Sequence, residues 1–140
     1  MLVVVDTNVL VSGIFWAGTP GRVLDAWANG RFTLCVTPEI AEEYSAVIER
    51  LAAKCGRADL ARRWQAYLID HAQFAEATRR FTECRDPDDA MFVECALTLG
   101  APFLVSGDDD LRTLHRVEQT EILSPSQFLE RLEPQSQQSR

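Results

Sequence analysis

Near its amino terminus the chain reads Leu2-Val3-Val4-Val5-Asp6-Thr7-Asn8, an apolar run that stops abruptly at three polar residues. A short, continuous run rich in β-branched residues is typical of a strand buried on both faces, as in a parallel sheet. Because helices cover both faces of a parallel sheet, this run predicts a protein of the α/β class.

Further along the chain, segments with strand character alternate with segments of helical periodicity. Thr37 and Pro38, for example, suit the N-cap and the first residue of a helix. Glycines and a proline between positions 13 and 21 predict a loop after the first strand. We expect further strands at 32–36, 74–77, 102–105 and 121–123, and helices at 20–29, 37–51, 58–71, 86–100, 109–115 and 125–132.

This alternation predicts a three-layer α/β/α sandwich around a central, mainly parallel sheet, since each strand is reached through a right-handed crossover. Residues 1–132 are expected to form one domain. The polar residues 133–140 are expected to form a disordered tail.

The composition indicates an ordinary globular protein with an acidic balance. We find no signal-peptide pattern and no apolar run long enough to span a bilayer, so we expect a cytoplasmic protein without a membrane partner. The four cysteines lack the close spacing of a zinc site and are expected to be reduced, structural thiols.

The net charge of −7 disfavours non-specific nucleic-acid binding. A polyanionic substrate therefore requires a bound cation or a local arginine patch.

Two acidic residues directly follow predicted strands, where α/β proteins bind their ligands. Asp6 follows the first strand, and Asp108 follows the strand at 102–105 within Leu104-Val105-Ser106-Gly107-Asp108-Asp109-Asp110. An Asx turn leaving the strand is the alternative role for Asp6. Hydrogen bonds from Thr7 and Asn8 could brace its carboxylate in the site, which a mere turn would not require. In the second segment we assign Asp109 to capping the next helix, which leaves Asp108 for the site and Asp110 as an auxiliary acid.

Two further acids are selected by their direction on a helix, at about 100° per residue. Glu43 lies on the flank of a buried stripe, whereas Glu42 points away from it. Asp89 shares a stripe with inward-facing apolar residues, whereas Asp88 points outward and suits the helix dipole. A salt-bridged Glu43 and a dipole-stabilising Asp89 remain the alternatives.

Each acid alone has an ordinary structural explanation, but the set of four suggests a common site. Clustered carboxylates suit hard cations such as Mg²⁺ or Mn²⁺ rather than zinc. Such sites serve phosphoryl transfer, where metal ions activate a water and neutralise the leaving oxygen. We therefore predict a divalent-metal site formed by Asp6, Glu43, Asp89 and Asp108.

Four segments in this order resemble the PIN-domain family. They are Val-Val-Asp-Thr-Asn-Val-Leu at 4–10, Thr-Pro-Glu-Ile-Ala-Glu-Glu-Tyr at 37–44, Arg-Asp-Pro-Asp-Asp-Ala-Met-Phe at 85–92 and Leu-Val-Ser-Gly-Asp-Asp-Asp-Leu at 104–111. The resemblance is greatest to bacterial proteins related to VapC, regarded as toxin components of toxin–antitoxin systems. It extends from residue 2 to about 130.

The resemblance implies a PIN-like α/β/α sandwich, frequent homodimers, and an Mg²⁺- or Mn²⁺-dependent ribonuclease that hydrolyses RNA phosphodiester bonds. Carried over by position, Asp6, Glu43, Asp89 and Asp108 are the metal-binding and catalytic acids. Asn8 and Ser106 fall where the family places supporting polar residues. An antitoxin protein is an implied partner.

Basic residues near these segments are candidates for steering the RNA backbone, although most are expected to be ordinary solvated side chains. They are Arg50, Lys54, Arg57, Arg62, Arg63, Arg79, Arg80 and Arg85.

Other functions compete with a toxin ribonuclease. One is a PIN-fold interaction module without catalysis, and another is an RNA-processing nuclease without an antitoxin. A more remote one is a haloacid-dehalogenase-type phosphatase, which also begins with a strand ending in Asp. That chemistry uses a second Asp two positions later, where this chain has Asn8.

Overall fold

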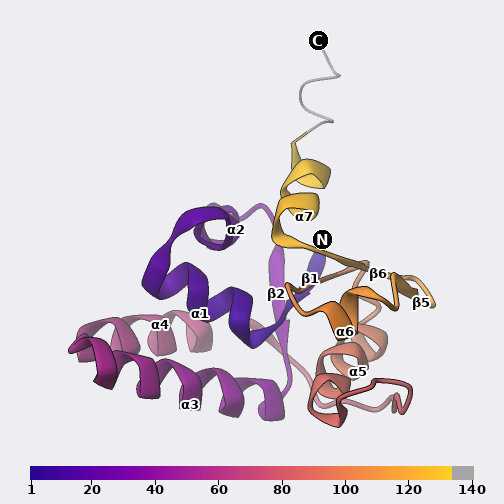
Figure 1. Ribbon diagram of the computed structural model, residues 1–140, viewed down its shortest axis with the longest axis horizontal. Coiled ribbons are helices and arrows are strands. Elements are labelled where there is room, and N and C mark those ends of the chain that lie inside the picture. The colour runs from indigo at the N-terminus through magenta and orange to yellow at the C-terminus, as the bar shows by residue number, and fades with distance from the viewer. Residues whose placement is uncertain (134–140) are drawn as a thin grey trace.

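A computed structural model describes residues 1–133, which form one mainly parallel sheet with helices on both faces (Figure 1). The strand order is β3-β2-β1-β4-β6-β5, and only β5 runs antiparallel, against β6. This confirms the predicted α/β class and the mainly parallel sheet. The strands are β1 (Leu2–Val5), β2 (Thr33–Val36), β3 (Gln73–Phe74), β4 (Phe103–Val105), β5 (Arg116–Val117) and β6 (Thr120–Leu123).

Helices connect the parallel strands, as expected, whereas β5 leads directly into β6. No helix in the described part of the chain is both long and apolar enough to cross a membrane. They are α1 (Thr7–Trp16), α2 (Gly18–Ala28), α3 (Pro38–Cys55), α4 (Ala58–His71), the 3₁₀ helix η1 (Pro87–Asp89), α5 (Ala90–Leu99), α6 (Asp109–Arg112) and α7 (Pro125–Leu132).

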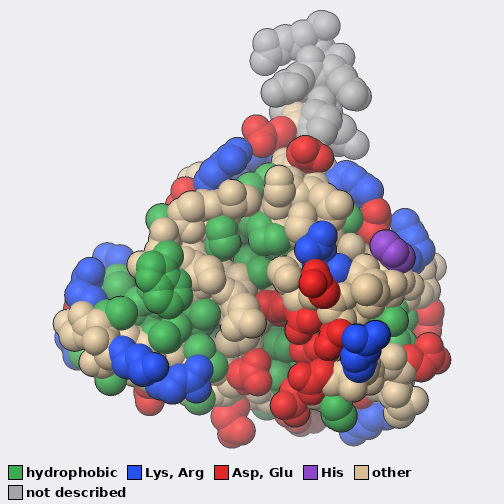
Figure 2. Space-filling model, viewed as in Figure 1, with side chains coloured by type: hydrophobic (Ala, Val, Ile, Leu, Met, Phe, Trp, Pro, Cys, Tyr) green, Lys and Arg blue, Asp and Glu red, His purple; other side chains and the backbone are tan. Residues whose placement is uncertain are grey.

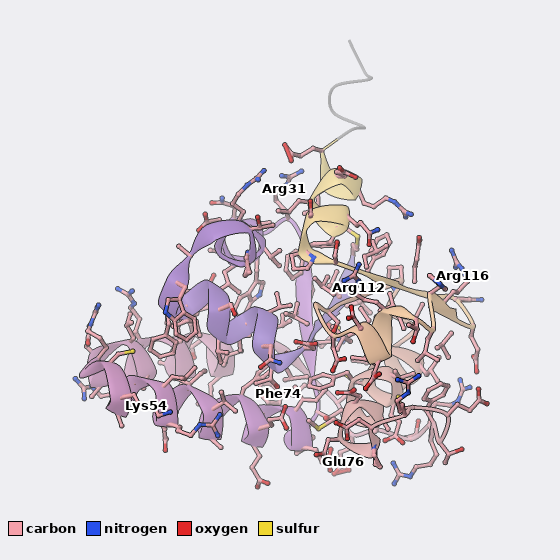
Figure 3. The ribbon with its side chains drawn as sticks, in the orientation of Figure 1. Arg31, Lys54, Phe74, Glu76, Arg112 and Arg116 are labelled. Atoms are coloured by element: carbon pink, nitrogen blue, oxygen red, sulfur yellow. The ribbon has the colours of Figure 1, made fainter. Side chains whose placement is uncertain are left out.

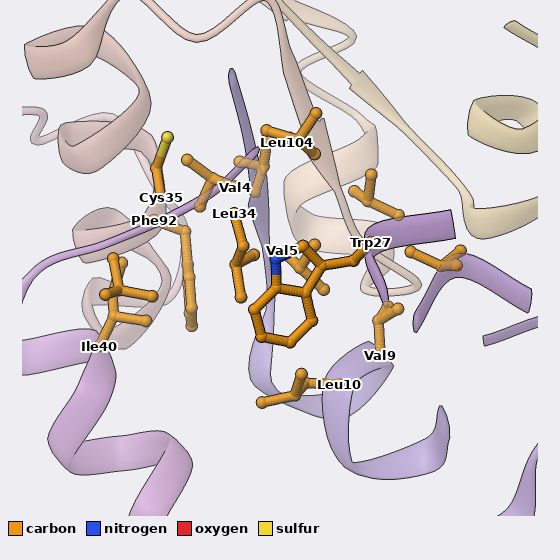
Figure 4. Packing of buried hydrophobic residues seen from close by; sticks show 14 of the residues in the cluster. Val4, Val5, Val9, Leu10, Trp27, Leu34, Cys35, Ile40, Phe92 and Leu104 are labelled. Carbon is orange, nitrogen blue, oxygen red and sulfur yellow. The ribbon is translucent and has the colours of Figure 1, made fainter. Parts of the chain in front are cut away.

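The core fills the space on both sides of β1, the central strand. Val4 of β1 is the register partner of Leu104 of β4, and both are buried. Figure 4 shows them in one apolar cluster with Val5, with Phe92 of α5 and with Trp27 of α2. α5 packs against β1, β2 and β4, and α7 packs against β4, β6 and α2. Since β1 is buried on both faces, its carboxyl end is fixed firmly, and Asp6 follows it directly.

One predicted loop is in fact a helix. α1 begins at Thr7, immediately after β1, because the Asp6 carboxylate caps it by accepting a hydrogen bond from the Val9 backbone N–H at 3.2 Å. Gly13 lies inside α1 rather than in a turn, and there it lets α2 approach closely. A Cβ at Gly13 would lie 2.8 Å from the Leu24 side chain and from the Pro20 carbonyl oxygen. The glycine serves helix packing here, not chain reversal.

Smaller differences concern short elements. The strand expected at 74–77 is β3, which pairs with β2 only over Gln73 and Phe74. The helix expected at 109–115 ends at Arg112, a turn follows, and Arg116–Val117 form β5, which was not predicted. The predicted tail at 133–140 lies outside the described residues, apart from Glu133.

Candidate metal centre

Asp6 occupies a buried position at the end of β1, with only 5% of its surface exposed. One carboxylate oxygen caps α1, and the other accepts a hydrogen bond from the Ser106 hydroxyl. Burial raises the pKa of Asp6, which the bonds from Ser106 and from the backbone of Val9 and Asn8 partly offset, and the charge of Asp108 raises it further. The side chain that caps α1 therefore also lies at the candidate site.

The turn after β4 is joined to Asp6 through a single hydroxyl. Ser106, which is fully buried, donates to Asp6 and accepts from the Asp108 backbone N–H at 2.9 Å. Because β4 lies beside β1, the two strand ends meet at the same edge of the sheet. Ser106 thus links the backbone of Asp108 to the carboxylate of Asp6.

Glu43 points into this edge of the sheet from α3. It is half-buried and accepts a hydrogen bond from the buried hydroxyl of Thr7, whereas Glu42 is exposed. The neighbouring Tyr44 is fully buried and donates its hydroxyl to the Val5 carbonyl oxygen. Thr7 was expected to donate a hydrogen bond to Asp6. That expectation is wrong, because the Thr7 hydroxyl donates to Glu43 instead.

Asp89 carries a buried oxygen that has no hydrogen-bond partner. Within residues 1–133, its Oδ2 atom is the one buried side-chain oxygen or nitrogen without such a partner. Burial first, and then the charges of Asp108 and Asp86, raise the pKa of Asp89 to about 7. Asp88 is exposed, and Asp86 caps η1 by accepting from the Asp88 N–H at 3.0 Å. The direction expected for Asp89 is the one found.

Asp108 itself caps α6, which corrects the assignment of that role to Asp109. Its Oδ1 atom accepts from the Asp110 N–H at 2.8 Å, whereas the Asp109 side chain is 92% exposed and lies 3.6 Å from Arg112. The N-cap is one residue earlier than expected because α6 begins at Asp109, which makes Asp108 the residue before its first turn. As with Asp6, capping does not remove this acid from the site.

The predicted acids meet around one small pocket. Asp6, Glu43, Asp89 and Asp108 line a cavity of about 190 Å³, together with Thr7, Asn8, Val47, Arg50 and Phe92. Side chains of Asp and Glu form a continuous band on this face of the molecule (Figure 2). Residues from four separate parts of the sequence are thereby brought together.

The tightest group within this band differs from the predicted set. Oxygens of Asp89, Asp108 and Asp110 lie within 4.8 Å of one another. Asp110 is therefore more central than an auxiliary acid, although Arg85 holds it in an ion pair of 3.3 Å. Asp6 and Glu43 flank this group. Each accepts a hydrogen bond from a hydroxyl group, Asp6 from Ser106 and Glu43 from Thr7.

Comparison with known proteins agrees with the four sequence segments. A family model described as a PIN domain matches residues 2–110, which is well over half of the chain. The chain belongs to the PIN-domain family. Comparison with curated proteins gives no match. Among solved structures, the fold is similar to a chain in the crystal structure of VapBC2 from Rickettsia felis bound to a DNA fragment from their promoter. The TM-score is 0.61 and the identity 13%, over 87% of this chain and 97% of that chain.

The residues of this PIN domain fit a hard divalent cation. The acidic side chains of the pocket, together with Thr7 and Asn8, offer oxygen ligands, which Mg²⁺ and Mn²⁺ prefer. An unpartnered buried carboxylate oxygen is costly unless a ligand satisfies it, and Asp89 Oδ2 is such an atom. A cation among Asp6, Asp89 and Asp108 would satisfy it and would also reduce the repulsion that raises the Asp89 pKa.

The candidate RNA-steering residues differ in their surroundings. Arg50 lines the acidic pocket, whereas Arg57 is paired with Asp59 at 3.0 Å and Arg85 with Asp110. Lys54 is exposed on the part of α3 that lies away from the acidic band (Figure 3). Of these four, Arg50 lines the acidic pocket, and Arg85 reaches the carboxylate group only through its ion pair with Asp110.

Proposed function

We propose that this PIN domain is an Mg²⁺- or Mn²⁺-dependent ribonuclease that hydrolyses RNA phosphodiester bonds. One observation carries the proposal: the partnerless buried oxygen of Asp89 in a pocket that Asp6, Glu43 and Asp108 also line. Four carboxylates around one small cavity repel one another, so a protein retains them where a cation is to be held. Membership of the PIN family supports nuclease chemistry for that cation.

The proposed roles follow from the contacts of each side chain. Asp6, Asp89 and Asp108 hold the cation, and Glu43 completes the acidic wall. Ser106 and Thr7 keep Asp6 and Glu43 in fixed orientations by donating their hydroxyl hydrogens. When bound, the cation supplies an activated water and positive charge against the phosphate. Asn8, which is exposed at the mouth of the pocket, is a supporting contact for the substrate.

The proposed biological setting is a toxin–antitoxin pair in the cytoplasm, with the chain acting as the toxin and as a homodimer. The fold likeness to a chain of the VapBC2 crystal structure supports an antitoxin partner. Expression of the chain alone should then arrest growth, and co-expression of a small adjacent reading frame should relieve the arrest. Growth that is unaffected by the chain would instead favour a nuclease without an antitoxin.

The test of the nuclease proposal is an RNA cleavage assay in Mg²⁺, in Mn²⁺ and in EDTA, with the native chain and with Asp6→Asn. Asparagine preserves the cap of α1 but removes the charge, so we expect a folded protein whose cleavage falls by at least about a hundredfold. The matched control is Asp109→Asn, because Asp109 is a neighbouring acid that points into solvent. Cleavage that survives either EDTA or Asp6→Asn would overturn the proposal.

A further inference from the structure

A second pocket opens directly beside the candidate metal centre. It has a volume of about 560 Å³ and lies between α3 and η1. Ala46, Val47, Pro87 and Met91 contribute apolar surface to it. It shares Glu43, Val47 and Arg50 with the acidic pocket, so the two cavities are contiguous. We call this second cavity the α3–η1 groove.

Arg50 stands at the junction of the two cavities and is unengaged. It lines both, and within residues 1–133 it makes no ion pair or hydrogen bond. This holds although four acidic residues line the same groove, namely Glu39, Glu42, Glu43 and Asp88. An arginine among so many carboxylates usually pairs with one of them, as Arg85 does with Asp110. Its planar guanidinium therefore remains available for a bidentate contact with an incoming anion.

The charge of the molecule makes this availability important. A phosphate that approaches the acidic band meets repulsion from carboxylates on both sides of the cavity. A bound cation offsets part of that repulsion, and an adjacent guanidinium can offset more at the point where the two cavities meet. Beyond Arg50, the apolar surface of Ala46, Val47 and Met91 suits the face of a nucleobase rather than another phosphate.

We propose that the α3–η1 groove binds the nucleotide that flanks the scissile phosphate, with Arg50 contacting an RNA phosphate at the junction. This inference rests on the proposed ribonuclease function and adds to it the path of the strand beside the metal centre. It also singles out Arg50 from the other basic residues. Arg50 acts on the substrate and holds no metal.

The experiment compares Arg50→Ala and Arg50→Lys with Arg31→Ala. Arg31 is remote from the acidic band (Figure 3) and makes its hydrogen bond to the Leu132 carbonyl, so its replacement removes the same charge without touching the groove. RNA affinity is measured by fluorescence anisotropy with a short labelled single-stranded RNA in Mg²⁺, in an Asp6→Asn background that suppresses cleavage. Mn²⁺ affinity and kcat/KM are measured in the otherwise native chain.

We expect Arg50→Ala to weaken RNA binding and to lower kcat/KM by about tenfold or more, which corresponds to the loss of one charge-assisted contact. Arg50→Lys should lose less, and Arg31→Ala should stay within about twofold of the native chain. Mn²⁺ affinity should be unchanged or higher in Arg50→Ala, because the substitution removes a positive charge that lies near the carboxylates.

Equal RNA affinity for Arg50→Ala and Arg31→Ala would overturn the inference, as would a loss of Mn²⁺ affinity that accounts for the loss of cleavage. A native chain that cleaves no RNA in either metal overturns the proposed function alone. In that case the anisotropy measurements still test the groove. RNA binding that Arg50→Ala weakens supports the inference. A lack of RNA binding in both the native and the Asp6→Asn background overturns it.

Discussion

At Asp89, burial and the charges of neighbouring carboxylates act together on one side chain. Its pKa is about 7 in the folded chain, against an ordinary value of 3.8, so the folded state retains a proton that the unfolded state has lost between about pH 4 and pH 7. Stability that depends on Asp89 is therefore present below about pH 4 and is lost as the pH rises through about 7.

The prediction is that Asp89→Asn flattens this pH dependence in metal-free buffer. The variant should unfold at a higher temperature than the native chain at pH 8, and the difference should shrink towards pH 5. Thermal unfolding in EDTA, followed by circular dichroism at both pH values, measures it. A variant that is less stable than the native chain at pH 8 would indicate that the carboxylate mainly stabilises the start of α5.

Ser106 is predicted to be required for both stability and metal affinity, because its hydroxyl joins Asp6 to the Asp108 backbone. Ser106→Ala leaves a buried carboxylate oxygen and a backbone N–H without this partner, at a cost of about 1–3 kcal/mol in unfolding free energy. Ser106→Thr keeps the hydroxyl and should retain most of the Mn²⁺ affinity. Denaturant unfolding and Mn²⁺ titration of both variants check this, and equal behaviour of the two would contradict it.

Residue-level inference from sequence succeeded where local geometry sets the outcome. The helical angle correctly separated half-buried Glu43 from exposed Glu42, and half-buried Asp89 from exposed Asp88. It failed where the partner is distant in sequence, since nothing near Thr7 indicates a bond to a glutamate 36 positions away. The same limit applies to Arg85, whose pairing with Asp110 depends on how the chain folds back.

At the level of elements, α1 and α2 depend on one close approach, at Gly13. A methyl group there would meet the Leu24 side chain and the Pro20 carbonyl oxygen at 2.8 Å, so Gly13→Ala should destabilise the fold by about 1–3 kcal/mol. Gly21→Ala is the matched control, because its Cβ would lie 3.4 Å from that of Ala17, an ordinary contact. In a helix this control should be neutral or gain up to about 1 kcal/mol.

Denaturant unfolding of the two glycine variants provides the measurement. If both behave alike, the spacing of α1 and α2 tolerates a side chain and Gly13 is not a packing requirement.

Helices with clear periodicity were easier to predict from the sequence than short strands. α4 and α7 match their expected bounds, and α7 also has a capping box at Ser124 that marks its beginning. α1 was missed because Gly13 and the residues that follow it resemble a loop, although Asp6 followed by apolar residues is also an N-cap signal. β5 has only two residues and depends on pairing with β6, which local sequence does not encode.

For the whole molecule, divalent cations should act as a stabilising ligand. Binding only to the folded state raises stability by mass action, and here it also relieves carboxylate repulsion. We expect the unfolding temperature in EDTA to rise when Mg²⁺ or Mn²⁺ is supplied in excess, and to rise much less in Asp6→Asn. Differential scanning fluorimetry measures both, and Asp109→Asn should respond like the native chain. An equal response of Asp6→Asn and the native chain would indicate cation binding elsewhere.

The position of β4 beside β1 has a consequence for the moment at which the proposed activity first exists. Asp6 and Ser106 are 100 positions apart in the chain, and Asp108 comes near Asp6 only after β4 has paired with β1. The carboxylate cluster therefore does not exist in any partly folded state in which these two strands are still apart. Under the proposed function, such a state would hold no cation and would cleave no RNA.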